Sequence, residues 1–431
     1  MPHSARKSEL VLVIGFLAVI AAVPVTQTGL ELARHERVQF TDVFRRWPTE
    51  GRLRQFERTL EEKSWFQQKL RPGVQGFLFA TLRETGAQGV RGRDQWLFYR
   101  PDLRYLVDRS ATTDGASKWT SLSDDATPRG SVERAILRFR DQLQERGIAL
   151  VVVPVPGKPS VYPDRVTGRA VGRPPQVQSP TLELLRTLRR NGVSTVDLFS
   201  VFGTARSDAA LPGIHGPLYL AHDTHWTPLG AQLAAASVAA RLREMNLAPS
   251  QAKEFHAERV PVTRWGDVLD MMQIPGLREA FPSQTVECLR VLDPALGPLV
   301  PTASDRPGTY RYPGQQASVF VLGDSFCRIY QYPEPQSLGE LPAAAGRMED
   351  SGTKRLLPGS AGFISHLALA LRSPVDAIVS DGGASTDVRR KLSTDPEILE
   401  GKKVVIWEFV ERDIALGGQG WEDVPLPVKL D

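Results

Sequence analysis

Residues 148–156 read IALVVVPVP and contain no charged side chain. A strand in which apolar and polar residues do not alternate is buried on both faces, as in a parallel sheet that is covered by helices. The preceding residues 132–147, VERAILRFRDQLQERG, repeat apolar side chains at helical spacing and end at a glycine, which predicts an amphipathic helix. This helix and strand together indicate an α/β domain.

The same alternation of helix and apolar strand recurs along the chain. Helices are predicted over 181–192, 228–245 and 363–372, and strands over 96–99, 193–199, 319–322, 375–383 and 402–410. Residues 30–90 are expected to be largely helical, 109–131 to form a long loop and 292–316 to be irregular. The pattern predicts a doubly wound, mostly parallel sheet with flanking helices.

The N-terminal segment has a different character. Residues 10–25, LVLVIGFLAVIAAVPV, are uncharged and follow Arg6 and Lys7. As a helix rising about 1.5 Å per residue, this run reaches roughly 24 Å, close to the hydrocarbon core of a bilayer at about 30 Å. Positive charge before the run favours a cytoplasmic N-terminus and an exported chain, so we predict an uncleaved signal anchor. A buried N-terminal helix of a soluble domain is the alternative.

Composition and cysteine content exclude several classes of protein. Hydrophobic residues make up 41% of the chain and charged residues 24%, which predicts a folded core rather than a disordered chain. The net charge is +4, but the basic residues are scattered, so a nucleic-acid partner is not indicated. Cys288 and Cys327 have neither CxxC nor zinc-site spacing, and a single disulfide between them stays open.

The stretch VFVLGDSF, residues 319–326, ends a predicted buried strand in a turn that carries a serine. Open α/β sheets place their sites at the carboxyl ends of strands. Gly323 permits a sharp turn, and the N–H of Ser325 can face a developing oxyanion. A serine nucleophile needs a histidine base that a third group orients. Gly-Asp-Ser is also an ordinary turn, and Cys327 is an alternative nucleophile without an evident activating neighbour.

The missing base and its orienting group occur in HDTHWTPLGA, residues 222–231. Thr227 and Pro228 predict the N-cap and first residue of a helix, so Asp223 and His225 lie in the loop before it. Residues two apart in extended backbone project to the same side, which lets the carboxylate orient the imidazole. We therefore predict a triad of Ser325, His225 and Asp223.

Two other interpretations fit the same loop. His222, Asp223 and His225 are metal-ligand types, although three ligands within four residues rarely enclose an ion and a further one, such as His215, is needed. In the other interpretation, Asp223 or Thr227 only caps the helix.

Five stretches together resemble the alginate O-acetyltransferase family of AlgJ/AlgX type, over roughly residues 85–415. They are DTHWTPLGA, VLGDSF, GRDQWLFY, VVVPVPGKPSVYPDR and VVIWEFVER. Members of this family are SGNH-hydrolase-like proteins that place acetyl groups on exopolysaccharides outside the bacterial inner membrane. The resemblance implies Asp223 as orienter, His225 as base and Ser325 as the nucleophile that carries acetyl. In ordinary SGNH esterases the serine comes first, whereas here the Asp-x-His pair precedes it.

The resemblance implies an O-acetyltransferase that acetylates hydroxyl groups of an exported, alginate-like polysaccharide through an acetyl-serine, without a metal or organic cofactor. It also implies an acetyl donor supplied by an integral membrane acyltransferase. The expected parts are a signal anchor at 1–30, a helical lead-in at 31–84 and an SGNH-hydrolase-like acetyltransferase domain at 85–431. We expect a single-pass protein of the inner membrane with its catalytic domain in the periplasm.

Two further functional classes fit the chain. A carbohydrate esterase uses the same three residues, because water replaces the sugar hydroxyl in the second step. A non-catalytic, polysaccharide-binding or scaffold subunit of an exopolysaccharide complex needs none of them.

Several residues near these motifs are candidates for substrate binding. Tyr330 and Tyr332 follow the serine, and aromatic faces stack on sugar rings, although core packing explains them equally well. Trp407, Glu408 and Arg412 lie at the end of the last predicted strand and are candidates to reach the site or to serve the fold.

Two charged residues have two explanations each. Asp267, in RWGDVLDMMQIP, resembles a recurring segment of the family and also suits the start of a helix. Lys158, in a loop made rigid by prolines, faces the polymer or is simply solvated.

Overall fold

The computed structural model divides the chain into two compact units. The smaller comprises Met1–Gly86 with Gln273–Leu277, and the larger comprises Ala87–Met272 with Arg278–Asp431. The structure describes residues 3–35, 38, 41, 53, 64–65, 69, 71–82, 84–107, 132–174, 179–207, 216–249, 252–274, 277–299, 308–312, 317–332, 359–416 and 420–427. The predicted loop at 109–131, His215 and most of the predicted helical segment between 36 and 70 lie outside these residues.

The smaller unit contains the helices α1 (His3–Ala33) and α3 (Arg71–Leu82). Within α1, the stretch Leu12–Ala33 has a mean hydropathy of 1.9 and is not buried. It is the one helix in the described part of the chain that is long and apolar enough to cross a membrane. Because a signal sequence has the same length and composition, anchoring stays a prediction.

The larger unit is built on a six-stranded sheet with the strand order β4-β3-β11-β9-β10-β8. Its strands are β3 (Ala149–Val155), β4 (Ser194–Thr195), β8 (Thr309–Tyr310), β9 (Val319–Gly323), β10 (Val375–Val379) and β11 (Val404–Val410). All neighbours are parallel except β8, which pairs antiparallel with β10. The prediction of a mostly parallel sheet is therefore confirmed.

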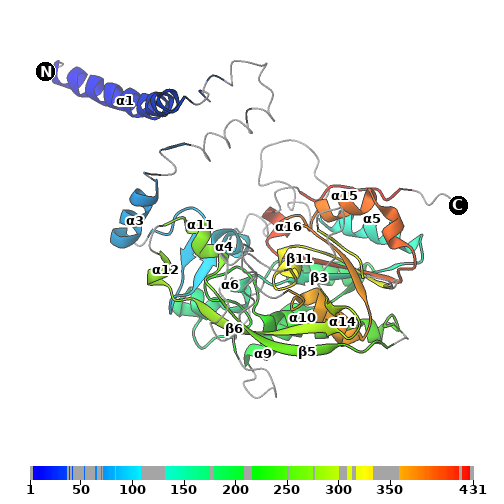
Figure 1. The fold of residues 1–431 in the computed structure, drawn as a ribbon. Helices are drawn as coiled ribbons and strands as arrows, with labels where there is room; N and C mark the ends of the chain where they lie inside the picture. Colours follow the sequence, from blue (N-terminus) through cyan, green and yellow to red (C-terminus); the bar gives the residue numbers. More distant parts are fainter. Residues whose placement is uncertain are drawn as a thin grey trace. The chain divides into compact units, whose positions relative to one another are not determined.

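Side chains that alternate along each strand separate two hydrophobic cores. Val151 and Val153 of β3 pack with α9 (Leu198–Ser207), α10 (Pro228–Glu244) and α14 (Phe363–Leu371). Leu150 and Val152 pack on the opposite face. The helices there are α5 (Val132–Gln144), α8 (Thr181–Arg190) and α15 (Asp387–Ser393). Figure 1 shows α5 and α15 on one side of β3 and β11, and α9, α10 and α14 on the other.

Shorter elements complete the larger unit. The hairpin β1 (Gly89–Arg91) and β2 (Leu97–Tyr99) leads into α4 (Arg100–Val107). A separate antiparallel sheet contains β5 (His256–Arg264), β6 (Gln284–Asp293) and β7 (Gly297–Pro298). The remaining elements are α6 (Lys158–Val161), α7 (Pro163–Val166), η4 (Gly168–Ala170), α11 (Asp267–Met272), α12 (Leu277–Ala280), α13 (Ser325–Arg328), η6 (Pro396–Leu399) and α16 (Asp413–Leu416).

Three sequence-based expectations need correction. The strand predicted over 375–383 ends at Val379. The strand predicted over 193–199 is only two residues long, because Asp197 accepts a hydrogen bond from the N–H of Ser200 and so starts α9. The stretch 292–316, predicted to be irregular, contains the end of β6 together with β7 and β8. Cys288 and Cys327 are both buried and free, so the possible disulfide is absent.

Candidate active site

The turn after β9 presents Ser325 at the carboxyl edge of the sheet. Asp324 caps α13, since its Oδ1 accepts a hydrogen bond from the N–H of Phe326 at 2.8 Å. Its Oδ2 accepts from the N–H of Val410 at 2.9 Å. One buried carboxylate thus fastens the serine turn to the end of β11.

A second buried carboxyl group, that of Glu408 on β11, lies beneath the same turn. Its Oε2 accepts hydrogen bonds from the N–H of Asp324 at 3.0 Å and from Cys327 Sγ at 3.1 Å. Burial and the charge of Asp324 raise the pKa of Glu408 well above its ordinary value, which favours the neutral carboxyl. Burial and Glu408 also raise the pKa of Cys327, so its thiol stays protonated and the alternative of a cysteine nucleophile is not supported.

Ser325, His225 and Asp223 form a continuous hydrogen-bonded row. His225 Nε2 lies 2.8 Å from Ser325 Oγ, although the two residues are 100 positions apart. His225 Nδ1 lies 2.7 Å from Asp223 Oδ1, which also accepts the His225 backbone N–H at 3.0 Å. When Nδ1 carries the proton, its N–H donates a hydrogen bond to the carboxylate, and Nε2 is free to accept a hydrogen bond from the serine hydroxyl. Thr227 caps α10 through the N–H of Gly230, which ends the loop as predicted.

The second oxygen of Asp223 has partners of its own. Asp223 Oδ2 accepts from Arg264 Nη2 at 3.1 Å and from the N–H of Asp267 at 3.2 Å. Burial alone would raise the pKa of Asp223, but Arg264 and the hydrogen bonds from His225 hold it well below its ordinary value. Burial alone would lower the pKa of His225, but Asp223 and Asp267 outweigh it and raise that pKa.

Asp267 places a second carboxylate beside the histidine. It accepts hydrogen bonds from the N–H of Thr224 at 2.7 Å and from the Thr224 hydroxyl at 2.6 Å. Its Oδ2 lies 3.5 Å from His225 Nδ1. Burial and the charge of Asp223 raise the pKa of Asp267 to about 6. The residue before it, Gly266, has φ +104°, and a Cβ there would lie 2.5 Å from the carbonyl oxygen of His222, so only glycine fits.

Asp223, His225 and Asp267 also have the side-chain types of a metal site. Their ligand atoms all lie within 4.8 Å of one another. The Arg264 guanidinium already supplies the positive charge next to Asp223, however, and His225 Nδ1 is engaged by the carboxylate. This donor set fits a triad better than a cation. His222, which suggested a metal in the sequence, is buried edge-on against Phe281, and burial lowers its pKa to about 4.

Two of the predicted substrate-binding residues lie in the protein core. Trp407 is fully buried on the face of the sheet that packs against α5, and its Nε1 donates to the carbonyl oxygen of Ala384 at 2.8 Å. Tyr330 is 3% exposed, and its hydroxyl donates to the carbonyl oxygen of Trp226 at 3.2 Å. A substrate-binding role for either ring is therefore wrong, because neither ring face is accessible.

The other two candidates retain some exposure. Tyr332 is half-buried, and its ring centroid lies 4.5 Å from that of Tyr310. Arg412 donates to Asp102 Oδ1 at 3.0 Å, and its guanidinium lies 5.9 Å from the ring centroid of Phe326, next to the serine. Its side chain is 13% exposed.

Sequence reasoning missed several polar groups that support the site. Lys158 was expected to face the polymer or solvent, but it is completely buried. Arg264, the last residue of β5, and Glu411, directly after β11, were not singled out, because a charged residue at the end of a strand looks the same in sequence whether its side chain lies in solvent or beneath an active site. The apolar run before Glu411 was the only available signal, since it predicts a buried strand end there.

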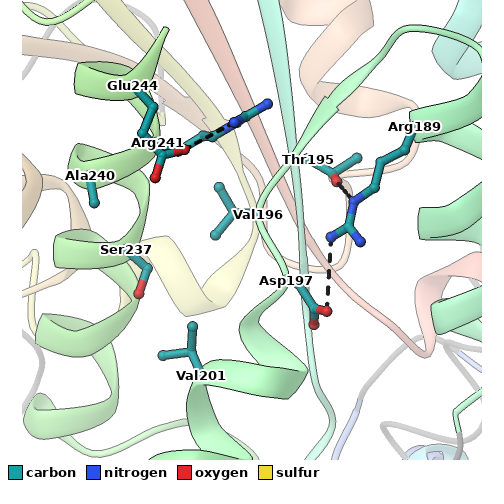
Figure 2. Close-up of a pocket in the computed structure, with 9 residues that line it drawn as sticks. All are labelled: Arg189, Thr195, Val196, Asp197, Val201, Ser237, Ala240, Arg241 and Glu244. Carbon is teal, nitrogen blue, oxygen red and sulfur yellow. Dashed lines mark hydrogen bonds and ion pairs between the residues drawn. The ribbon is translucent and has the colours of Figure 1, made fainter.

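A pocket of about 550 Å³ lies elsewhere in the larger unit (Figure 2). It is lined by residues of α8, β4, α9 and α10, among them Arg189, Asp197, Ser237 and Arg241. None of Ser325, His225 and Asp223 is among its lining residues. Arg189 and Arg241 are engaged by neighbouring side chains of the pocket wall, as the dashed lines of Figure 2 show.

Known proteins resemble this chain in sequence and in fold. A probable alginate O-acetylase AlgJ of Pseudomonas aeruginosa is 27% identical over 344 residues, which cover 77% of this chain and 72% of that protein. The corresponding protein of Pseudomonas syringae pv. tomato is 24% identical over 332 residues, covering 75% of this chain and 68% of its own. The O-acetyltransferase domain of Pseudomonas putida AlgJ has the same fold, with a TM-score of 0.50, 22% identity, and coverage of 76% of this chain and 92% of that domain.

The family model described as "SGNH hydrolase-like domain, acetyltransferase AlgX" matches residues 90–340, a range that includes Asp223, His225 and Ser325. This match covers more than half of the chain and confirms the resemblance that the sequence motifs indicated. The chain belongs to the AlgX family of SGNH hydrolase-like acetyltransferase domains.

Proposed function

We propose that this protein transfers acetyl groups to hydroxyl groups of an exported polysaccharide through an acetyl-serine at Ser325. The observation that carries the proposal is the row of two short hydrogen bonds, 2.7 Å and 2.8 Å, that joins Asp223, His225 and Ser325. The relatives are named alginate O-acetylases, so an alginate-like polymer is the first acceptor to test.

In the first step, Ser325 Oγ attacks the carbonyl carbon of the acetyl donor while His225 Nε2 takes the hydroxyl proton. Asp223 stabilises the imidazolium that forms and keeps Nδ1 protonated. The tetrahedral intermediate collapses, the leaving group takes the proton from His225, and acetyl-serine remains. The backbone N–H of Ser325 is the proposed oxyanion donor.

In the second step, a sugar hydroxyl gives its proton to His225 and attacks the acetyl carbon. The tetrahedral intermediate collapses as the bond from the acetyl carbon to Ser325 Oγ breaks, and His225 returns the proton to Oγ. Here the electrostatics suit a base, because Arg264 keeps Asp223 ionised and Asp223 raises the pKa of His225. A carbohydrate esterase would use water in place of the sugar hydroxyl. Membership of an acetyltransferase family favours the sugar.

Location and partners follow from the same proposal. Helix α1 would anchor the protein in the bacterial inner membrane, with the larger unit in the periplasm. An integral membrane acyltransferase would supply the acetyl donor. Arg412 and Tyr332 would contact the acceptor, because Arg412 lies beside Phe326 and both side chains keep some exposure.

The test compares the wild type with Ser325→Ala, using an activated acetyl ester with and without a mannuronate oligosaccharide. We expect the wild type to form an acetyl adduct on the peptide that contains Ser325 and to yield acetylated oligosaccharide, both detected by mass spectrometry. Ser325→Ala should form neither. Ser237→Ala, which removes a hydroxyl from the separate pocket of Figure 2, is the matched control and should behave as the wild type.

Two results would contradict the proposal. Wild-type activity in Ser325→Ala would exclude the serine as nucleophile. Acetate release at the same rate with and without oligosaccharide, with no acetylated sugar, would show an esterase.

A further inference from the structure

Lys158 is a completely buried lysine at the start of α6. Its Nζ donates hydrogen bonds to the backbone carbonyl oxygens of Leu220 at 3.0 Å, Ala221 at 3.1 Å and Asp223 at 2.6 Å. All three acceptors belong to the loop that carries Asp223 and His225. A lysine has three N–H donors, so the ammonium group is fully used in holding this one loop.

Several neighbours of the ammonium group offset part of the cost of burying its charge. It lies 5.7 Å from a ring centroid of Trp96 and 5.1 Å from that of Phe98, where aromatic faces attract a cation. Burial lowers the pKa of Lys158 to about 8, while the charges of Asp223 and Asp267 act in the opposite direction. Burying an ammonium group is costly unless its donors are satisfied, and here three carbonyl oxygens satisfy them.

The three carbonyl oxygens explain why a cation is needed at this position. Each carries a partial negative charge, and their convergence on one nitrogen would be repulsive without a positive group between them. The residues from Leu220 to His225 form no helix, and their backbone hydrogen bonds are scattered: the N–H of Leu220 donates to the carbonyl oxygen of His225, and the carbonyl oxygens of Ala221 and His222 accept from Leu97 and Val268. Lys158 adds three more hydrogen bonds to carbonyl oxygens of this loop.

The segment that carries Lys158 is itself fastened to the sheet by Glu411, directly after β11. Glu411 Oε1 accepts hydrogen bonds from the N–H of Gly157 at 2.6 Å and from the hydroxyl of Ser160. Its Oε2 accepts from the hydroxyls of Ser179 and Thr181. Lys158 therefore contacts the loop from a segment that Glu411 holds in place.

Two tyrosines join the same two segments at other points. Tyr219 donates its hydroxyl proton to the carbonyl oxygen of Pro156. Tyr162 accepts the N–H of Leu218 at 2.8 Å. These contacts hold the beginning of the loop, whereas Lys158 alone reaches the carbonyl of Asp223, two residues before the histidine.

We propose that Lys158 is a positioning residue for acetyl transfer, whose ammonium group sets the distance between His225 Nε2 and Ser325 Oγ. The inference rests on the proposed function, because it assigns a role to the base and nucleophile of that reaction. Lys158 touches neither substrate nor reacting atoms and acts through the loop.

The chain offers a matched control in Lys402, a second buried lysine. Its Nζ donates to the carbonyl oxygen of Ala317 and to Asp376 Oδ2, both at 2.6 Å. It precedes β11 and so lies at the opposite end of that strand from Glu411. Lys158→Met and Lys402→Met therefore make the same chemical change at the two ends of the sheet.

The experiment measures kcat and KM for an activated acetyl ester in the full-length protein, per folded molecule. A misplacement of about 1 Å costs on the order of 100-fold in rate, so Lys158→Met should lose about 100-fold in kcat while KM changes by less than about threefold. Labelling of Ser325 by a sulfonyl fluoride should slow in parallel. Lys402→Met should lose stability and keep its kcat. A kcat of Lys158→Met near the wild-type value, or an equal loss in Lys402→Met, would overturn the inference.

Lys158→Gln keeps two N–H donors on a neutral, shorter side chain. It replaces Lys158→Met in the same measurement if that variant does not fold. We expect it to lose at least about tenfold in kcat with little change in KM, and wild-type kcat in this variant would reject a positioning role. Ser325→Ala separates the two proposals. If it stays active, the proposed function fails; if it is inactive while the Lys158 variants are fully active, only the present inference fails.

Discussion

Burial and Asp223 have the largest effects on the pKa of His225, and two further side chains of opposite charge adjust it. The Arg264 guanidinium disfavours the protonated imidazole and lowers its pKa, whereas the Asp267 carboxylate favours the protonated form and raises it. Both side chains also contact the orienting loop, through Asp223 and Thr224 respectively. The pH range in which the histidine acts as a base is therefore adjustable in both directions.

Substitution of either residue should shift the pH profile, with opposite signs. Asp267→Asn removes a negative charge, so the pKa of His225 falls and the acidic limb of kcat/KM moves to lower pH. Arg264→Met removes a positive charge, so the same limb moves to higher pH. Each shift should amount to up to about one pH unit, measured with an activated acetyl ester.

Asp270→Asn is the control for this pair, because Asp270 lies on the same helix, α11, and its carboxylate pairs with Arg278. It should leave the pH profile unchanged. Shifts in the same direction for Asp267→Asn and Arg264→Met would show that charge is not what connects them to His225.

At the scale of elements, the parallel register of β9 and β11 builds the serine turn. Leu322 pairs with Trp407, so the next residues along, Gly323 and Glu408, lie side by side. A Cβ on Gly323 would overlap the sulfur of Cys327 and lie 2.8 Å from Glu408 Oε2. Glycine is therefore required by close packing beneath the turn.

Gly323→Ala should destabilise the protein by about 1–3 kcal/mol, the usual cost of inserting a methyl group into a packed core. The loss should be smaller in a Cys327→Ala background, because removal of the sulfur relieves the closest overlap. Chemical denaturation of the two single variants and the double variant gives the coupling free energy. Strictly additive losses would show that the added methyl group meets something other than the sulfur.

The elements that sequence predicted well are those buried on both faces. The strands β3 and β9 appear in the sequence as uninterrupted apolar runs, and β10 and β11 as apolar runs with a single acidic residue each, because burial on both faces removes any alternation. The hairpin of β5 and β6 was missed because many of its side chains are exposed or half-buried, so its sequence carries no clear apolar periodicity. The strand β4 was overextended because Val196 and Leu198 continue the apolar run into a helix.

In the site, too, the residues that could be predicted depend on sequence neighbours, whereas those that could not depend on contacts distant in sequence. Asp223 and His225 were recognisable because their geometry depends on two neighbouring positions and a helix cap. The role of Lys158 depends on carbonyl groups more than 60 positions away, and no local pattern encodes that contact. Trp407 was misassigned for a related reason, since the face to which a strand residue points follows from sheet register.

At the scale of the whole molecule, α1 exposes a long apolar surface. Its apolar side chains are largely uncovered, with Leu12 72% and Phe16 65% exposed. A continuous apolar surface of this length marks a membrane or protein interface, and a span of 22 residues is sufficient to cross a bilayer. The smaller unit therefore contains the helix for which we predict a membrane anchor, and the larger unit contains the candidate site.

Removal of residues 1–34, with export through a cleavable signal peptide, should separate these two contributions. The full-length protein should stay in the membrane fraction after alkaline carbonate extraction, whereas the truncated protein should be soluble in the periplasm. Turnover of an activated acetyl ester should persist in the truncated protein, because Asp223, His225 and Ser325 all belong to the larger unit.

Acetylation of polymer in cells should fall in the truncated protein, since tethering raises the effective concentration of an enzyme near a membrane-bound donor by orders of magnitude. An unrelated single-pass helix in place of α1 should restore it, because anchoring rather than the sequence of α1 is what the donor requires. Extraction of the full-length protein by carbonate would show that α1 does not span the bilayer. Full polymer acetylation by the soluble form would show that the acetyl donor reaches Ser325 without a membrane tether.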